Sequence, residues 1–543
     1  MAGTSTHTVT HQPPPLVGYD VFTADRALTE AVGRHTAPDV REEVRAELAA
    51  LGRAAGSGQL QEWAAQADGQ PPRLRTHDRY GHRIDEVEFH PAWHRLLGKG
   101  VSAGLTAAWT RPAGHLRRAA GLLVWTQVEA GICSPLSTTH AAVPALRADP
   151  GLAAEWEPRL TSTVYDRALR PPGEKPGALF GMGVTEKRGG SDVHATTAAR
   201  PLAEPGTYLL TGHKWFCSAP MSDAFLVLAR APGGLTCFLV PRVLSDGSRN
   251  VFLIQRLKDK LGNRSNASAE IEFDATWARR VGDEGDGARI VTGMVAATRL
   301  DCAVGSAGLM RQAVAQAVHH CAHREASGGK LADRPLMRNV LADLALESEA
   351  ATALALRLAA AHDDGGEQER ALLRLAVPAA KYWITKRCAP VAVEAAECLG
   401  GDGYVEESGL PRLVRESPVN SFWGGAGNVQ ALDVLRVLRG DPGALDACLT
   451  EIGRAHGADH RLDRAVKDLF TELADLEGVE GRARRLVERL ALVLQGSLLV
   501  RHAPPEVADA FCASRLGGDH GASFGTLPAG LALGPVVERA RPV

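Results

Sequence analysis

Residues 181–193 read GMGVTEKRGGSDV, and residues 211–218 read TGHKWFCS. The first stretch gathers glycine, threonine and serine at the point where the residue pattern changes from helical to extended. Short runs rich in β-branched and aromatic residues follow it, such as AFLVLAR and LTCFLVPR, and Gly, Pro, Asp and Ser separate them. This alternation predicts a small β-barrel or sandwich over residues 181–285.

Helical periodicity flanks the β segment on both sides. Apolar residues recur three and four apart in residues 41–180, as in REEVRAELAALGRAAG, and again in residues 286–440. The order helical, β, helical predicts an α+β fold with a helical N-domain, a central β domain and a helical C-domain. Residues 1–40 precede this pattern and are expected to form an N-terminal arm.

A further helical unit is predicted for residues 441–543. It contains an amphipathic helix whose apolar face requires a partner surface. That face consists of Leu462, Val466, Leu469, Leu473 and Leu476.

The bulk composition excludes several classes of protein. The formal net charge is -2 and the sequence pI is about 6.8, so no chain-wide charge favours nucleic acid or an anionic membrane. The nine cysteines are scattered singly, without a C-x-x-C pair or a zinc-spaced cluster, which indicates free thiols and no metal site. No apolar run approaches the roughly 18 residues of a membrane span, and the first residues do not resemble a secretion signal. We therefore expect a cytoplasmic protein with no membrane partner.

The two stretches quoted first resemble the flavin-binding motifs of the acyl-CoA dehydrogenase family. The first is similar to its T-E-x-x-G-S-D loop and the second to its K-x-W-I-T-N strand. Fixed donors at such a loop suit a flavin, because the reduced ring carries negative charge. Taken singly, a Gly-rich turn and a core tryptophan also explain these stretches, but their order and spacing favour a flavin site. The resemblance implies an FAD cofactor held by Met182, Thr185, Ser191, Trp215, Phe216, Cys217 and Ser218.

Two later motifs imply a cofactor site shared between subunits. Arg324 matches the arginine of the family's R-x-x-F-G motif, which reaches the FAD pyrophosphate of a neighbouring subunit, although Ser327 replaces the Phe. An arginine fork suits paired phosphate oxygens, while a solvated residue at a helix end is the alternative. In ECLGGDGYVEES, which resembles the family's adenine-side turn, Gly400 and Gly401 permit close backbone approach. The resemblance therefore implies a homodimer or homotetramer, with oligomer contacts from the arm.

Other segments place the resemblance in the AidB-like branch of this family, whose fold has a β domain between two helical domains, the second a four-helix bundle. They are FHPAWH at 89–94, QVEAG at 127–131, LKDKLGNRSNAS at 257–268 and PLMR at 335–338. The similarity continues past residue 440, into a C-terminal helical extension. It implies a flavoprotein of bacterial alkylation stress, with weak acyl-CoA dehydrogenase activity and a DNA-binding C-terminal region.

The expected catalytic base is missing. Desaturation of an acyl thioester needs a carboxylate to remove the α-proton, and AidB-like chains carry it in the turn S-x-W-E-G-S-G-N. Here the turn reads SFWGGAGN, so Gly424 stands at the glutamate position, while Trp423, Gly425 and Asn428 match cofactor-binding positions. Some family members place the base instead just before an arginine matched by Arg299, where this chain has Thr298.

Two other carboxylates remain as weak candidates for the base. Asp301 lies further along the helix predicted to contain Thr298, and Glu416 follows Arg415. The structural alternative for Asp301 is that it caps a helix or forms a salt bridge. The structural alternative for Glu416 is an ion pair with a basic neighbour. Loss of a positioned base typically costs about a hundredfold to ten-thousandfold in rate. We therefore expect a flavin-dependent oxidoreductase that is a weak or altered dehydrogenase acting on a small molecule, or one that oxidises a C–N or N–N bond.

A second functional class is a damage-response flavoprotein that acts mainly by binding DNA. Arg482, Arg485 and Arg489 have the spacing of one basic helical stripe, which phosphate contacts require. Acidic residues such as Glu480 and Glu488 interleave with them, so a solvated, salt-bridged face is the favoured interpretation.

Overall fold

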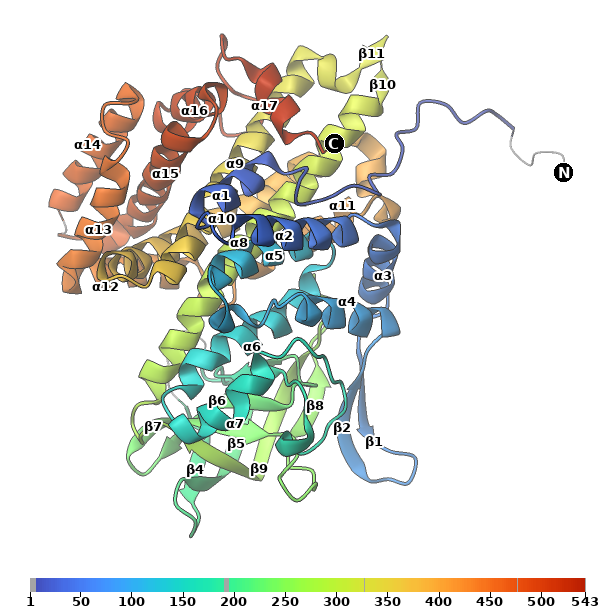
Figure 1. Ribbon diagram of the computed structural model, residues 1–543, viewed down its shortest axis with the longest axis vertical. Helices are drawn as coiled ribbons and strands as arrows, with labels where there is room; N and C mark the ends of the chain where they lie inside the picture. Colours follow the sequence, from blue (N-terminus) through green and yellow to red (C-terminus); the bar gives the residue numbers. More distant parts are fainter. Residues whose placement is uncertain (1–5, 190–194, 327, 476, 543) are drawn as a thin grey trace.

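Helices form both ends of the computed structural model, and a β-barrel lies between them in the sequence (Figure 1). The structure describes residues 6–189, 195–326, 328–475 and 477–542. The N-terminal helices are α1 (Arg26–His35), α2 (Arg41–Ala55), α3 (Gly58–Gly69), α4 (Pro91–Ser102), α5 (Gly114–Thr126), α6 (Cys133–Leu146) and α7 (Pro150–Leu160). Asp25 and Asp149 start α1 and α7, because their side chains accept hydrogen bonds from free backbone N–H groups of the first turn.

A β-hairpin interrupts the N-terminal helices, where the periodicity predicted only helix. Its strands β1 (Arg73–His77) and β2 (Arg83–Glu88) pair antiparallel. Leu74 and Val87 face each other across the hairpin and pack against the core of the β domain. The hairpin therefore extends the helical half of the chain onto the barrel.

The β domain is a closed barrel. Its strands are β3 (Phe180–Gly183), β4 (Ala198–Pro201), β5 (Thr207–Ser218), β6 (Ala224–Ala231), β7 (Gly234–Pro241), β8 (Leu253–Leu257) and β9 (Ser268–Val281). Strands β4, β5, β9, β7 and β6 pair in a ring, while β3 adds to β6 and β8 adds to β9. Closure removes the exposed edges that an open sheet of this size would present.

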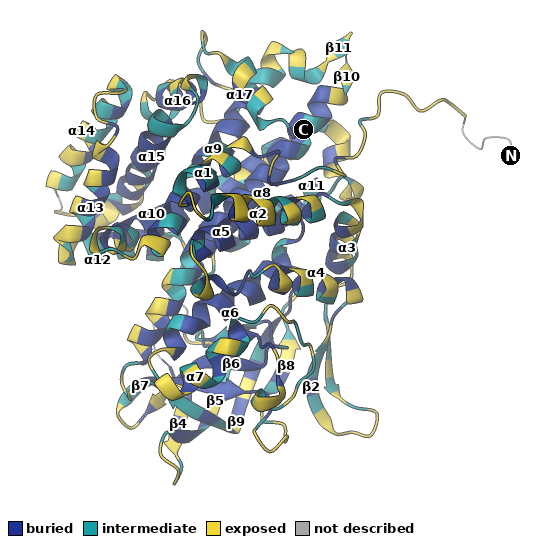
Figure 2. Cartoon of the chain, in the orientation of Figure 1, coloured by how far each residue is buried: buried dark blue, intermediate teal, exposed yellow. Residues whose placement is uncertain are grey.

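The C-terminal half begins with a long central helix. The helices are α8 (Gly287–His323), α9 (Pro335–Asp364), α10 (Glu367–Glu397), α11 (Leu410–Glu416) and α12 (Gly427–Gly440), with a short hairpin of β10 (Glu325–Ala326) and β11 (Gly329–Lys330). Every residue of α8 from Leu300 to Val314 is buried, and such a helix belongs in the middle of a core. It contacts α5, α6, α9 and α10 (Figure 2). Gly308 allows this packing, because a Cβ there would lie 2.5 Å from the Leu123 carbonyl oxygen.

The remaining helices lie at one side of the molecule, and most of them pack against α9 or α10 (Figure 1). They are α13 (Pro442–Gly453), α14 (His460–Ala474), α15 (Ala483–His502), α16 (Pro505–Phe511) and α17 (Leu533–Ala540). The predicted amphipathic helix is α14: Leu462 and Leu469 are buried, and Val466 and Leu473 pack beside them. Leu476 lies outside the described residues. None of the described helices is long and apolar enough to span a membrane.

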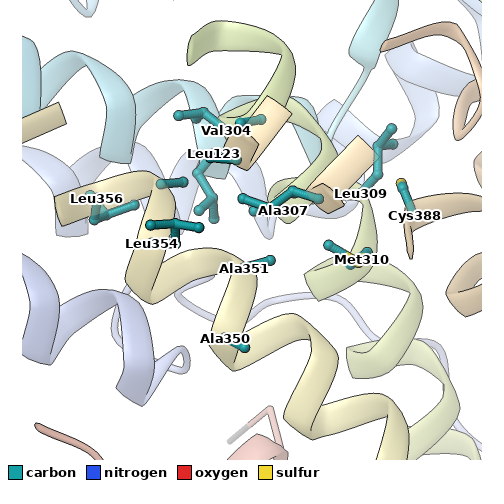
Figure 3. Close-up of a cluster of buried hydrophobic side chains, with 14 of the residues drawn as sticks. Leu123, Val304, Ala307, Leu309, Met310, Ala350, Ala351, Leu354, Leu356 and Cys388 are labelled. Atoms are coloured by element: carbon teal, nitrogen blue, oxygen red, sulfur yellow. The ribbon is translucent and has the colours of Figure 1, made fainter. Parts of the chain in front are cut away.

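The core of the helical half converges where α5, α8 and α9 meet. Figure 3 shows Leu123 of α5, Val304 and Ala307 of α8 and Leu354 of α9 directed toward one another. Small residues alternate with large ones here, so the helices pack closely against one another.

We predict that Leu354→Ala lowers the free energy of unfolding by about 2–5 kcal/mol, because it leaves a cavity at a side chain that is 1% exposed. Val393→Ala on α10 is the control, since that side chain is 50% exposed and should change the value by less than about 0.5 kcal/mol. Urea unfolding followed by circular dichroism measures both. Equal losses for the two variants would contradict this packing.

Candidate functional site

The turn 421–428 is held rigidly between α8, α10 and α12. Arg299 Nε donates to the carbonyl oxygen of Gly424 (3.0 Å), and Lys381 Nζ donates to that of Gly425. Gln430 Nε2 donates to both oxygens, at 2.9 and 2.8 Å. Burial lowers the pKa of Lys381 to about 8. Four hydrogen bonds to two adjacent carbonyls fix the backbone at the position where the resemblance expects a glutamate.

Gly424 and Thr298, the two positions at which the resemblance predicts a base, lie opposite each other. A Cβ on Gly424 would lie 3.8 Å from Thr298 Oγ1, and 3.6 Å from the Cγ of Arg299. Both are ordinary van der Waals distances, so space for a side chain exists. Gly424 has φ of +69°, which strains any residue other than glycine. Neither of the facing positions carries a carboxylate.

Asp301 is committed to an ion pair. Both of its carboxylate oxygens accept from Arg118, at 2.6 and 2.7 Å, and both side chains are buried. Arg118 Nε also donates to the carbonyl oxygen of Leu105. If Asp301 accepted a proton from a substrate, the buried Arg118 would lose its counter-charge. Asp301 therefore has a structural role, as one partner of a buried salt bridge.

Glu416 does not face the turn but belongs to a buried pair of carboxyl groups. Its Oε1 accepts from the backbone N–H of Asn263 (2.5 Å), whereas Glu129 Oε2 accepts from Ile132 N–H (3.0 Å) and Ser265 Oγ (2.7 Å). Burial, and next the charge of Glu129, raise the pKa of Glu416 to about 8. Each residue keeps one buried oxygen without a partner among the described residues.

No role was predicted for Glu129, although it lies in the QVEAG segment that carries part of the family resemblance. The local sequence does not indicate whether a single glutamate in a helical stretch is buried. Only the approach of α11 to the 129–132 turn brings it beside Glu416. Burial raises the pKa of both carboxyl groups, so their shared site favours the protonated form.

A cavity of about 30 Å³ lies beside the 423–425 turn. Its walls come from α5, α6, α8, the loop after β8 and the 419–423 segment. Trp423 forms part of the wall, and its Nε1 donates to Asn420 Oδ1 (3.1 Å). Half of the lining side chains are polar: Thr126, Ser134, Ser137, Asn263, Asp301 and Asn420.

The loop that follows β3 is anchored to the barrel by a buried ion pair. Glu186 accepts from Lys214 Nζ (2.6 Å) and from the hydroxyl of Thr197 (2.6 Å). The carbonyl oxygen of Thr185 accepts from Trp215 N–H (2.8 Å), which ties the two predicted flavin motifs together. Met182 lies on β3, partly buried, and Ser191 lies outside the described residues.

Strand β5 presents two aromatic faces at the second motif. Lys258 Nζ lies 3.4 Å from the ring centroid of Trp215, and Phe216 is 51% exposed. The Cys217 side chain is buried in the barrel core, so only its backbone can meet a cofactor. Ser218 Oγ lies 3.5 Å from Ser268 Oγ, partly buried.

Two cations lie at the start of α12. Arg484 Nε donates to Asn428 Oδ1 (2.8 Å), and a Cβ on Gly427 would lie 3.1 Å from Lys386 Nζ. Among the described residues neither cation pairs with a carboxylate. Free N–H groups of a helix start and two unpaired cations attract a phosphate. Phe422, on the same turn, is 68% exposed and offers a further aromatic surface.

The remaining predicted cofactor residues lie on the surface. Arg324 ends α8, and its Nη1 donates to the carbonyl oxygen of His11 in the N-terminal arm (2.8 Å). Gly400 has φ of +62°, and a Cβ on Gly400 or Gly401 would meet open space. Gly403, in the same turn, is required by packing, because its Cβ would lie 1.9 Å from the Ala396 carbonyl oxygen.

These features fit an FAD group. Aromatic faces at Trp215, Phe216 and Phe422 suit a planar ring, and the cations beside α12 suit its phosphates. Among the described residues no cluster of His, Cys, Asp and Glu is arranged to hold a metal ion.

The basic stripe predicted for DNA is largely neutralised. Arg485 and Arg489 both pair with Glu472, at 3.0 and 2.8 Å, and Arg482 pairs with Asp475 at 3.1 Å. Arginines that are already paired with carboxylates attract the DNA phosphates less strongly.

Comparison with known proteins identifies relatives along nearly the whole chain. Residues 11–167 match the family "Adaptive response protein AidB N-terminal domain". Residues 181–276 and 285–439 match the middle and C-terminal domains of acyl-CoA dehydrogenase. The chain is 44% identical to the putative acyl-CoA dehydrogenase AidB of Escherichia coli (strain K12) over 513 residues, covering 93% of this chain and 94% of that protein.

Solved structures show the same fold. Caenorhabditis elegans ACDH-11, crystallised in complex with C11-CoA, has a TM-score of 0.85 and 27% identity, covering 94% of each chain. An acyl-CoA dehydrogenase from Bacillus anthracis, complexed with FAD, has a TM-score of 0.62, covering 79% of this chain and 78% of that chain. At 18% identity, the second likeness shows the fold alone.

The buried pair of carboxyl groups predicts a pH dependence of stability. Because the folded state raises the pKa of Glu416 from 4.5 to about 8, it binds the proton more tightly than the unfolded chain does. The contribution of this group is therefore complete below pH 4.5 and is lost as the pH rises toward about 8. Glu416→Gln, which stays neutral, should flatten the fall in the free energy of unfolding over this range.

Urea unfolding at several pH values measures the effect. Glu407→Gln is the matched control, since Glu407 is exposed and should leave the slope of the native chain unchanged. A slope that is identical in the native chain and in Glu416→Gln would refute the assignment.

Proposed function

The chain belongs to the acyl-CoA dehydrogenase family of flavin-dependent oxidoreductases, in its AidB branch, and we propose that it uses FAD without the family's usual catalytic glutamate. The observation that carries the proposal is the pairing of Gly424 with Thr298. The two alternative base positions face each other within 3.8 Å, and neither has an acidic side chain. The protein is accordingly a weak or altered dehydrogenase.

The residues that would hold FAD are distributed over both halves of the site. Trp215 and Phe216 offer aromatic faces from the barrel, Thr185 lies in the adjoining loop, and Lys386 and Arg484 supply positive charge for the phosphates. When bound, FAD supplies a two-electron acceptor. The protein supplies orientation, exclusion of water and the local charges.

The two carboxylates nearest the turn do not replace the missing base. Asp301 is bonded to Arg118 through both oxygens, and Asp433 pairs with Arg299. A substrate whose proton leaves without a carboxylate is therefore required. An amine, a hydroxylamine or a hydrazine meets this requirement, so the proposed reaction is oxidation of a C–N or N–N bond.

The alternative, a damage-response protein that acts mainly on DNA, has less support. Its basic stripe is paired with Glu472 and Asp475, whereas the cavity and the rigid turn have the arrangement of a reaction site. A gel shift on duplex DNA whose affinity falls steeply with salt would restore this alternative.

We propose further that the active form is a homodimer or homotetramer in the cytoplasm. Tyr404 and Leu336 are large apolar side chains that are strongly exposed, as expected of an interface. Arg324 holds the carbonyl oxygen of His11, so the arm and the predicted phosphate-binding arginine lie together. The nine cysteines are buried and free, which suits a reducing compartment.

The first test restores the carboxylate. We expect Gly424→Glu to raise the rate at which butyryl-CoA bleaches the flavin band by about a hundredfold to ten-thousandfold, because it returns a general base to the turn. Gly424→Gln is the matched control, since it carries the same strain at φ of +69° but no acid. Stopped-flow absorbance at about 450 nm measures the rates. Rapid bleaching by the native chain would mean that the base lies elsewhere.

The second test concerns the phosphate-binding cations. The double variant Lys386→Met/Arg484→Met should bind FAD more than about tenfold more weakly, because hydrogen bonds to a charged group contribute about 1.5–3 kcal/mol each. Quenching of flavin fluorescence measures the dissociation constant. Arg79→Met, on the exposed β1–β2 hairpin, removes a cation far from the turn and should leave the affinity unchanged. Equal affinity for the double variant and the native chain would remove these cations from the site.

A further inference from the structure

We infer that the cavity beside the 423–425 turn selects substrates that end in a short, uncharged, hydrogen-bonding group. The inference rests on the proposed function, because it assigns the substrate of that same site. It concerns the end of the substrate that enters the cavity, away from the bond that is oxidised.

The wall formed by α6 presents hydroxyl groups that have no partner. Ser134 and Ser137 line the cavity and are 8% and 2% exposed. Neither hydroxyl makes a hydrogen bond within the described part of the chain. Buried polar groups in native proteins are nearly always satisfied, and the exceptions indicate a ligand or an ordered water. One helical turn separates these two residues, so both hydroxyls can serve one group.

Asn263 adds a third polar group to the cavity lining. The side-chain amide of Asn263 lines the same cavity and makes no hydrogen bond to any described residue. Its backbone is fixed, because the N–H donates to Glu416 and the φ of +53° is one that asparagine tolerates better than most residues. Glu416 therefore acts as a positioning residue for Asn263.

The charge of the cavity is already balanced. Asp301 is the only charged side chain among the lining residues described, and both of its oxygens accept from Arg118. A cationic end-group would compete with a bidentate guanidinium, and an anionic one would meet no free cation. An uncharged group that both donates and accepts, such as a hydroxyl or an amide, satisfies Ser134, Ser137 and Asn263 without this competition.

An aliphatic chain is disfavoured for two reasons. It would fill the cavity yet leave the two hydroxyls and the amide without partners, and sites built for hydrogen bonds reject analogues that lack them. The cavity of about 30 Å³ exceeds the roughly 10–15 Å³ that one water needs, so it suits a short end-group.

The test uses the FAD-loaded chain and two pairs of ligands in which a terminal methyl group replaces a hydroxyl. The pairs are 4-hydroxybutyryl-CoA with valeryl-CoA, and ethanolamine with propylamine. Dissociation constants come from perturbation of the flavin spectrum and, independently, from the rise in melting temperature. We expect the hydroxylated member of at least one pair to bind about fivefold to tenfold more tightly.

The variants Ser137→Ala and Ser134→Ala/Ser137→Ala should reduce this preference toward equality. Ser222→Ala is the matched control, because Ser222 also carries a buried hydroxyl without a partner but does not line the cavity. If the double variant fails to fold, Ser137→Ala and the native chain decide the question.

Two results would overturn the inference while leaving the proposed function intact. One is tighter or equal binding of the methyl members by the native chain. The other is a hydroxyl preference that survives in the serine variants. Failure of the chain to take up FAD would instead overturn the proposed function, and the melting temperatures would still report whether the hydroxyl preference exists.

Discussion

The fixed carbonyl oxygens of Gly424 and Gly425 are the constraint on which the rest of the site depends. Three side chains from three helices, Arg299, Lys381 and Gln430, donate to these two oxygens. Two of the donors are cations that burial would otherwise penalise, so they and the turn stabilise each other. The turn thus keeps a defined place between α8 and the cavity although its customary acid is absent.

Two further groups of acidic side chains near the cavity, within the described residues, are either paired or held in a neutral-favouring site. Asp301 and Arg118 neutralise each other through a bidentate bridge, and Glu129 and Glu416 share a site in which burial favours the protonated form. A protein interior tolerates such groups only when they are paired or neutral. The cavity is consequently polar, and the one charge among its described lining residues is balanced by Arg118.

The sequence predicted the class of fold and most of the turn motifs, because these depend on local patterns. The alternation of short β runs with turn residues predicted the barrel. The apolar face of α14 predicted a helix that packs against a partner surface. The hairpin Arg73–Glu88 was missed, since its Leu74 and Val87 acquire meaning only by packing on the barrel core. Cys217 was predicted to meet the cofactor through its backbone, and only the structure shows that strand alternation turns its side chain into the barrel core.

By itself the sequence predicted that the turn lacks the acid expected from the family resemblance, because Gly424 can be read without coordinates. The tertiary structure alone decided what that loss means. It brought Thr298 opposite Gly424, joined Asp301 to Arg118 and paired Glu129 with Glu416, although these partners are far apart along the chain. Contacts of this kind depend on how helices cross and on which carboxylates lose their water, and no local pattern of residues encodes either.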